Sequence, residues 1–318
     1  MSTIAAPIGP AKIAGLERVE PQLRELQALA GPATALPHWT RSIRARASGP
    51  FLSRLRGRGM EYDESRPYLP GDDIRQLDWR VTARTGQPHT KLFREELERP
   101  VLLCVDYRRA MFFATRGVFK AVQAARVASL LAWRAQQNGD RVGVLLFADQ
   151  MHHELPPRRG QTGTMQLLKL LVTQAPLQRA ATPTEATSAT PLADALKRAA
   201  RVAKPGTLVF VISDFRGLDE AASVALAQLS LHADVGLVAI HDPLEALFPE
   251  FDGVAGLVDG RRSLRLAGVS TAERDSYAAQ FSTRLAALRQ LCRERRMLFT
   301  SMETTADPTT SLIKLFGG

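Results

Sequence analysis

The sequence predicts an α/β fold in which a doubly wound, mostly parallel sheet carries helices on both faces. Three observations lead to this prediction. From residue 100 onwards, short apolar runs of strand length recur, among them 101–106, 207–215 and 235–240. Longer stretches with apolar residues at helical spacing separate these runs, which is the pattern of βαβ units. The 318 residues are also 45% hydrophobic, which is enough for a substantial buried core.

The chain before residue 99 has a different pattern. We expect residues 1–98 to form an N-terminal part ahead of an α/β domain at 99–318. Leu16, Val19, Leu23 and Leu26 lie at helical spacing, so a short amphipathic helix is expected over 16–29. An arginine-rich stretch follows. Proline and glycine then divide residues 57–99 into short extended pieces, which predicts a small β-rich element.

Strands and helices alternate through the predicted α/β domain. Strands are expected at 101–106, 141–147, 207–215, 235–240 and 297–302, with a short edge strand at 151–155. Helices are expected at 117–138, 162–174, 190–205, 218–231, 271–296 and 308–316. The segment 175–190 is rich in Thr, Ala and Pro and is expected to be a loop. Sheets of this kind place their ligand sites in the crevice at the carboxyl ends of the strands.

The composition limits the class and the compartment of the protein. Two cysteines, Cys104 and Cys292, exclude a disulfide framework and a four-cysteine zinc site. The first residues lack a signal-peptide pattern, and no apolar run approaches the ~20 residues that a membrane-spanning helix needs. We therefore expect a cytoplasmic protein.

The formal net charge is +10, and its densest part is residues 41–60, where arginines face no acidic residue. The planar guanidinium binds carboxylates and phosphates equally well, so an acidic protein, a nucleic acid or an anionic lipid all suit this patch. The partner-binding candidates are the arginines of this patch together with two further arginines: Arg41, Arg44, Arg46, Arg54, Arg56, Arg58, Arg108 and Arg109.

The sequence contains no Walker loop, no G-x-S-x-G elbow and no H-E-x-x-H helix, so we expect no catalytic residues and no enzyme activity. The candidate site lies instead at strand ends. Asp106 ends the first buried strand and Asp214 ends the third, and in a doubly wound sheet both face the same crevice. Thr190 precedes a helix that begins near this crevice. The alternative is that both aspartates only cap turns.

Several motifs resemble one known family. They are R-P-Y-L-P-G-D-D-I-R-Q-L-D-W and A-R-T-G within 57–99, G-D-R-V-G-V-L-L-F at 139–147, V-I-S-D-F at 211–215 and H-D-P-L-E at 241–245. With them the sequence resembles the domain of unknown function 58 (DUF58) family over nearly its whole length. The resemblance implies a von Willebrand factor A-like domain in a typically bacterial protein. It also implies a MoxR-type AAA+ ATPase as partner, for which the protein is an adaptor or cochaperone in assembling or remodelling protein clients.

Von Willebrand A-like domains often bind Mg²⁺ at a metal-ion-dependent adhesion site, through a D-x-S-x-S loop, a Thr and an Asp. Asp106, Thr190 and Asp214 match this pattern, but Arg108 and Ala110 stand in place of the two serines. The lost hydroxyls and the added guanidinium predict a degenerate site that binds no Mg²⁺ or binds it weakly. We expect no other cofactor. We also expect Arg108 or Arg109 to pair with Asp106 or Asp214 and to supply the charge of the missing ion.

The other motif residues are expected to be structural, with partner docking as the alternative. Arginines alternate with aspartates in 66–84, which predicts an intramolecular ion-pair network with Tyr68 and Trp79 packed as anchors. The whole chain is thus predicted to be a non-enzymatic interaction module, and a nucleic-acid-binding protein that uses the 41–60 patch is the alternative. The motif residues are Arg66, Tyr68, Gly71, Asp72, Asp73, Arg75, Asp78, Trp79, Arg84, Asp242 and Glu245.

Overall fold

A computed structural model describes residues 15–38, 60–69, 74, 77–95, 99–180, 192–247, 254–258, 263–267 and 270–317. The chain divides into two compact units. Residues 1–47 and 99–318 make up the larger unit, and residues 48–98 make up the smaller one.

A six-stranded sheet forms the centre of the larger unit, and its order is β10-β7-β6-β3-β4-β5. All neighbouring strands are parallel except β5, which runs antiparallel to β4 at one edge. The chain starts at the central strand β3 and winds outward in both directions, which is the doubly wound order. The predicted fold class is therefore confirmed. The strands are β3 (Pro100–Asp106), β4 (Arg141–Phe147), β5 (His152–Arg159), β6 (Leu208–Ser213), β7 (Asp234–His241) and β10 (Leu298–Glu303).

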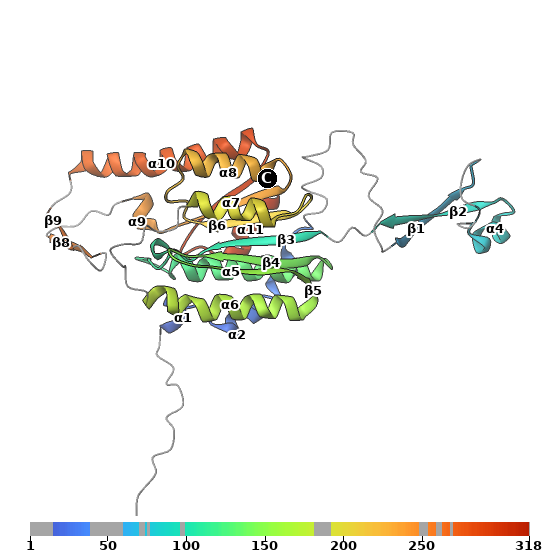
Figure 1. Cartoon of the computed structure of the whole chain (residues 1–318), viewed down its shortest axis with the longest axis horizontal. Coiled ribbons are helices and arrows are strands. Elements are labelled where there is room, and N and C mark those ends of the chain that lie inside the picture. The colour runs from blue at the N-terminus through green and yellow to red at the C-terminus, as the bar shows by residue number, and fades with distance from the viewer. Residues whose placement is uncertain are drawn as a thin grey trace, which may run out of the picture. The chain divides into compact units, whose positions relative to one another are not determined.

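Helices cover both faces of this sheet (Figure 1). One face carries α5 (Lys120–Gln137), α6 (Gly160–Ala180) and α11 (Pro308–Gly317). The opposite face carries α7 (Leu192–Val202), α8 (Glu220–Ser230) and α10 (Thr271–Glu294). The helix α6 continues through Pro176, so the loop predicted from residue 175 is wrong as far as Ala180. Ala175 is fully buried, and its packing in the core keeps this turn helical.

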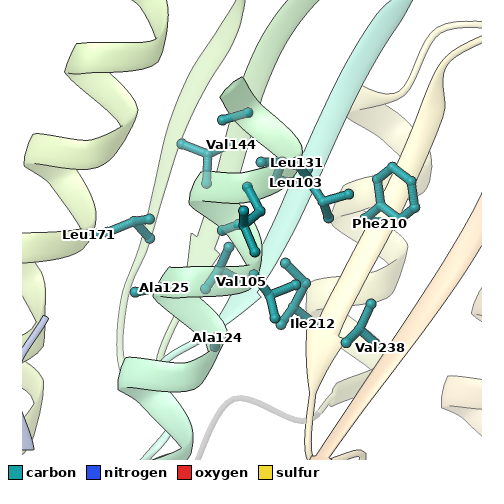
Figure 2. Packing of buried hydrophobic residues seen from close by; sticks show 14 of the residues in the cluster. Leu103, Val105, Ala124, Ala125, Leu131, Val144, Leu171, Phe210, Ile212 and Val238 are labelled. Atoms are coloured by element: carbon teal, nitrogen blue, oxygen red, sulfur yellow. The ribbon is translucent and has the colours of Figure 1, made fainter. Parts of the chain in front are cut away.

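The alternation of side chains along the strands builds a separate core on each face. In β3, Leu103 and Val105 point to the α5 side, whereas Leu102 and Cys104 point to the α7 side. Side chains at successive positions of a strand face opposite ways, so a sheet covered on both faces needs wholly apolar strands. Figure 2 shows the core on the α5 side, where β3, β4, β6 and β7 meet α5 and α6.

The N-terminal helices pack on the larger unit. The predicted single helix over 16–29 is two helices, α1 (Leu16–Val19) and α2 (Leu23–Ala28), followed by a 3₁₀ turn, η1 (Pro32–Ala35). Pro21 lies in the break between them, where its ring is tolerated. Leu26 is fully buried, and Trp133 of α5 donates a hydrogen bond from Nε1 to its carbonyl at 2.9 Å. Residues 15–38 therefore belong with the α/β unit, not with residues 48–98 in one N-terminal part.

The smaller unit contains a two-stranded antiparallel sheet of β1 (Met60–Pro67) and β2 (His89–Glu95), which is the small β-rich element that the sequence predicted. A short helix that the sequence analysis did not predict, α4 (Trp79–Thr85), lies between these strands along the chain. Asp78 caps its first turn, and Gly86 ends it with φ of +73°.

Three further short elements of the larger unit were also not predicted. They are α9 (Pro243–Ala246) and the hairpin of β8 (Val254–Val258) and β9 (Ser263–Ala267). Among the residues described, no helix has both the length and the apolar character needed to cross a membrane.

Candidate functional site

The carboxyl ends of β3 and β6 bring two predicted site residues together. Asp106 ends β3, and Asp214 directly follows β6. Both side chains are buried, and Ser213 donates a hydrogen bond from Oγ to Asp106 Oδ2 at 2.6 Å. The two aspartates therefore lie together at the carboxyl ends of neighbouring strands, as the alternation of strands and helices predicted.

Arg108 pairs with Asp106. Its Nη2 lies 2.7 Å from Asp106 Oδ2, its Nε lies 3.0 Å from Oδ1, and its backbone N–H donates to Oδ1 at 2.8 Å. Nη2 is also 3.7 Å from Asp214 Oδ1. The ion pair predicted for this loop is thus present, and the guanidinium lies beside both aspartates. Arg109 has a different position: it is exposed, and its backbone N–H donates to Asp149 at 2.9 Å.

Lys120 is a member of the site that the sequence analysis missed. It is the first residue of α5 and is fully buried. Its ammonium lies 2.8 Å from Asp214 Oδ2 and 2.7 Å from Glu245 Oε1. A buried ammonium needs compensating charge and hydrogen bonds, and these two carboxylates supply both.

Arg216 forms the solvent-facing part of the site. Its side chain is 48% exposed, and its Nη2 lies 2.8 Å from Glu245 Oε1. Its backbone N–H donates to Asp214 Oδ1 at 3.0 Å, and its carbonyl accepts from Arg108 Nη1 at 3.1 Å. The turn needs a left-handed residue, Phe215 with φ of +51°, whose N–H donates to Ser213 Oγ. Strain of this kind is kept where the surrounding contacts fix the backbone, as they do here.

The charges of this site balance. Three carboxylates face three cations, and we call these six residues the charge cluster: Asp106, Asp214, Glu245, Arg108, Lys120 and Arg216. Burial raises the pKa of Asp214, but Lys120 and the backbone N–H of Arg216 outweigh it, so this pKa lies below its ordinary value. For Asp106, burial prevails over the opposing effect of Arg108 and raises the pKa.

Asp242 follows β7 and holds the neighbouring loops together. Its carboxylate accepts hydrogen bonds from the N–H and the hydroxyl of Thr115 at 2.7 and 2.5 Å, from the N–H of Leu244 at 2.9 Å and from the hydroxyl of Thr304 at 3.2 Å. With Glu245 it forms the capping box of α9. Burial raises its pKa, but these hydrogen bonds lower it more, and the net shift is downward. Glu245 therefore joins three partners: the N–H of Asp242 in the capping box, Lys120 and Arg216.

The residues present do not fit a magnesium ion. Mg²⁺ needs near-octahedral oxygen ligands, and the Asp106 and Asp214 carboxylates instead bind the guanidinium of Arg108 and the ammonium of Lys120. Ala110, in the 3₁₀ turn η3 (Arg109–Met111), has no oxygen in its side chain. The described residues contain no group of three or more His, Cys, Asp or Glu side chains arranged to hold a metal ion. Thr190 lies outside them.

One motif residue of the smaller unit differs from the expectation, whereas the ion-pair network expected over 66–84 stays a prediction, because Asp72, Asp73 and Arg75 lie outside the described residues. Trp79 was expected to be a packed anchor, but its side chain is 70% exposed on α4. Asp78 is buried, caps α4 and accepts from Ser65 Oγ at 2.7 Å, whereas Tyr68 is half-buried. Arg66 donates to the carbonyl of Pro67, and Arg84 is exposed. The remaining predicted residues lie outside the described residues: Gly71, Asp72, Asp73, Arg75, Arg41, Arg44, Arg46, Arg54, Arg56 and Arg58.

Comparisons with known proteins give one family model and three bacterial relatives. Residues 64–287 match the sequence model described as "Protein of unknown function DUF58". An uncharacterized protein of Mycobacterium bovis and two from strains of Mycobacterium tuberculosis are each 28% identical over 267 residues, which covers 84% of this chain and 81% of theirs.

Solved structures that resemble the chain share little sequence with it. The conserved hypothetical protein BatB from Bacteroides thetaiotaomicron is 15% identical to this chain, with a TM-score of 0.44. The match covers 69% of this chain and 97% of the BatB chain. A von Willebrand factor type A structure from Catenulispora acidiphila is 14% identical, with a TM-score of 0.37. That match covers 72% of this chain and 42% of the solved chain.

Proposed function

The chain belongs to the DUF58 family of proteins of unknown function, and on this basis we propose that it is a non-enzymatic protein-interaction module of the von Willebrand A-like type. Its partner is a MoxR-type AAA+ ATPase, for which it is an adaptor or cochaperone in assembling or remodelling client proteins. The proposal includes a cytoplasmic location, because the ATPase works where ATP is available. The observation that carries it is the charge cluster at the carboxyl edge of the sheet.

The cluster supports recognition of a partner carboxylate without a metal ion. In an ion-dependent adhesion site, a divalent cation with open positions binds the acidic side chain of the partner. Here Arg216 lies at the same edge of the sheet, with its guanidinium half exposed. A guanidinium binds a carboxylate with two parallel hydrogen bonds, so Arg216 offers the partner a fixed geometry as well as a charge.

The same cluster argues against an enzyme. A general acid or base must be able to gain or lose a proton near the operating pH and must reach the substrate. Asp106, Asp214 and Glu245 are buried and are engaged with cations of the chain itself. We propose accordingly that the degenerate site binds Mg²⁺ weakly or not at all and needs no cofactor.

Binding of the purified chain to the purified MoxR-type ATPase of the same organism tests the proposal. We expect binding that depends on whether the ATPase holds ATP analogue, ADP or no nucleotide. The variant Arg216→Ala should weaken it about tenfold or more, because a charged contact at the centre of an interface is lost. The control is Arg201→Ala, which removes an exposed arginine on α7.

The outcomes separate the parts of the proposal. Absence of binding in every nucleotide state overturns the ATPase as partner. Equal binding of wild type and Arg216→Ala retains the partner but overturns the charge cluster as its contact. Turnover of a substrate by the chain alone, lost in Asp214→Asn, would overturn the non-enzymatic assignment.

A further inference from the structure

Three large apolar side chains of the smaller unit are exposed. Among the residues of this unit whose burial is described, the buried ones are Asp78 and Thr90, and both are polar. By contrast, Leu69, Ile74 and Trp79 are 57%, 65% and 70% exposed. A two-stranded sheet alone is marginally stable in water and gains stability when an apolar face is covered. Large exposed apolar side chains grouped in one small unit are typical of an interaction site.

The outer face of α4 has a defined composition. Successive residues of an α-helix are rotated by about 100°, so Trp79, Ala83, Arg80 and Arg84 lie on one continuous arc of about 140°. All four are exposed. On the opposite side Val81 and Thr82 are half-buried, and Thr82 accepts a hydrogen bond from the N–H of His89 in β2 at 3.0 Å. We call the exposed arc the Trp79–Arg84 face.

We propose that the Trp79–Arg84 face docks an acidic segment of a partner protein that also carries an apolar side chain. Tryptophan and arginine are the residues that most often dominate the energy of protein interfaces. An indole ring covers an apolar side chain of the partner, and the two flanking guanidinium groups bind its carboxylates in a forked geometry. Asp78 does not compete for them, because its carboxylate is used by the N–H groups of Arg80 and Val81 and by Ser65.

Charge and apolar content favour a protein over a nucleic acid as the occupant. Residues 48–98 contain nine basic and nine acidic residues, so the smaller unit lacks the overall positive field that drives binding to phosphates. Ile74 and Leu69 add aliphatic surface, which does not stack on bases as an aromatic ring does. This docking face belongs to the smaller unit and the charge cluster to the larger one, and the test of the docking face does not depend on the proposed ATPase.

Fluorescence anisotropy with labelled probes and the full-length chain tests the proposal. The main probe is a short synthetic peptide of Glu residues interrupted by Leu and Phe. The comparison probes are an all-Glu peptide, the same Leu/Phe peptide with Lys in place of Glu, and single-stranded oligothymidylate. At about 50 mM salt, where charge interactions are weakly screened, we expect the Glu/Leu/Phe peptide to bind tightest, in the micromolar range.

Two variants connect that binding to the face. Trp79→Ala and the double variant Arg80→Glu/Arg84→Glu should each weaken binding of the Glu/Leu/Phe peptide about tenfold. Leu231→Ala and Arg201→Glu are the matched controls, since each changes an exposed residue of the same kind in the larger unit, and they should leave binding unchanged. An unchanged thermal midpoint confirms that each variant is folded, as expected for exposed positions.

Three results overturn the proposal. The first is no binding of the Glu/Leu/Phe peptide by the wild type. The second is equal binding by wild type and Trp79→Ala. The third is tighter binding of oligothymidylate than of any peptide, with dependence on Trp79, which would make the face a nucleic-acid surface instead.

Discussion

Arg108 holds the carboxylate of Asp106 through both oxygens, and its Nη2 lies 2.7 Å from Oδ2. The two residues are separated by one position in the loop after β3, so the contact is local and forms as the loop forms. Because of this contact, the positive charge beside Asp106 is supplied by a side chain of the protein itself. The charge of Asp214 is compensated by Lys120, and the charge cluster is neutral without an added ion.

Replacing Lys120 with methionine should destabilise the larger unit by about 3–5 kcal/mol, because Asp214 and Glu245 would lose the buried cation between them. Urea unfolding at neutral pH measures the loss. The control is Lys197→Met: this exposed lysine lies 3.5 Å from Asp194, and its removal should cost less than about 1 kcal/mol. Similar costs for the two variants would show that the cluster is not a stabilising feature of the fold.

Addition of Mg²⁺ should leave the stability of the wild type unchanged, since Arg108 and Lys120 bind the carboxylates that the ion would need. A site with a Kd of about 1 mM would add about 1.4 kcal/mol at about 10 mM Mg²⁺, which thermal unfolding detects readily. Measurements in Mg²⁺, in Ca²⁺ and in chelator should coincide. Stabilisation specific to Mg²⁺ that disappears in Asp106→Asn would contradict the assignment of a degenerate site.

Gly117→Ala should cost more stability than Gly206→Ala. Both glycines have positive φ, +74° and +81°, so alanine is strained at each by about 1–2 kcal/mol. A Cβ at Gly117 would also clash with the carbonyl oxygen of Thr304, whereas a Cβ at Gly206 meets nothing within 4 Å. Chemical denaturation should therefore give a difference of about 2 kcal/mol or more between the variants. Equal losses would mean that the loop at Gly117 moves away from Thr304 at little cost.

The sequence was sufficient to predict the sheet and the meeting of Asp106 with Asp214. Wholly apolar runs reveal strands that are buried on both faces, and the residue after each run marks the carboxyl edge. The small hairpin of β8 and β9 was missed because its two strands are five residues each and lie outside the repeating strand–helix pattern.

Lys120 could not be predicted because periodicity treats every lysine as a solvent-facing residue. Its burial depends on two carboxylates that lie 94 and 125 positions away along the chain. A weak signal was present: the helix that begins at Lys120 is buried on nearly all sides, so it offers little surface for a charged side chain. The prediction for Trp79 was wrong for the opposite reason: aromatic residues are expected to be buried, but the side chain of Trp79 is 70% exposed.

Asp242→Asn should lower stability by about 1.5–3 kcal/mol at neutral pH, because a buried carboxylate that accepts several hydrogen bonds would be replaced by a neutral amide. The difference in stability between wild type and Asp242→Asn should become smaller at acidic pH. The pKa of Asp242 is lowered in the folded chain, so its contribution is complete above the unfolded value near 4 and is lost as the pH falls through the lower folded value.

Urea unfolding of wild type and Asp242→Asn between neutral pH and about pH 2.5 measures this convergence. A second variant, Thr115→Val, removes the hydroxyl that donates to Asp242 Oδ1 and should move the acid loss of stability toward higher pH. A difference between wild type and Asp242→Asn that stays constant down to the lowest pH would contradict the prediction. The carboxylate of Asp242 would then act only through its shape at the start of α9, not through its charge.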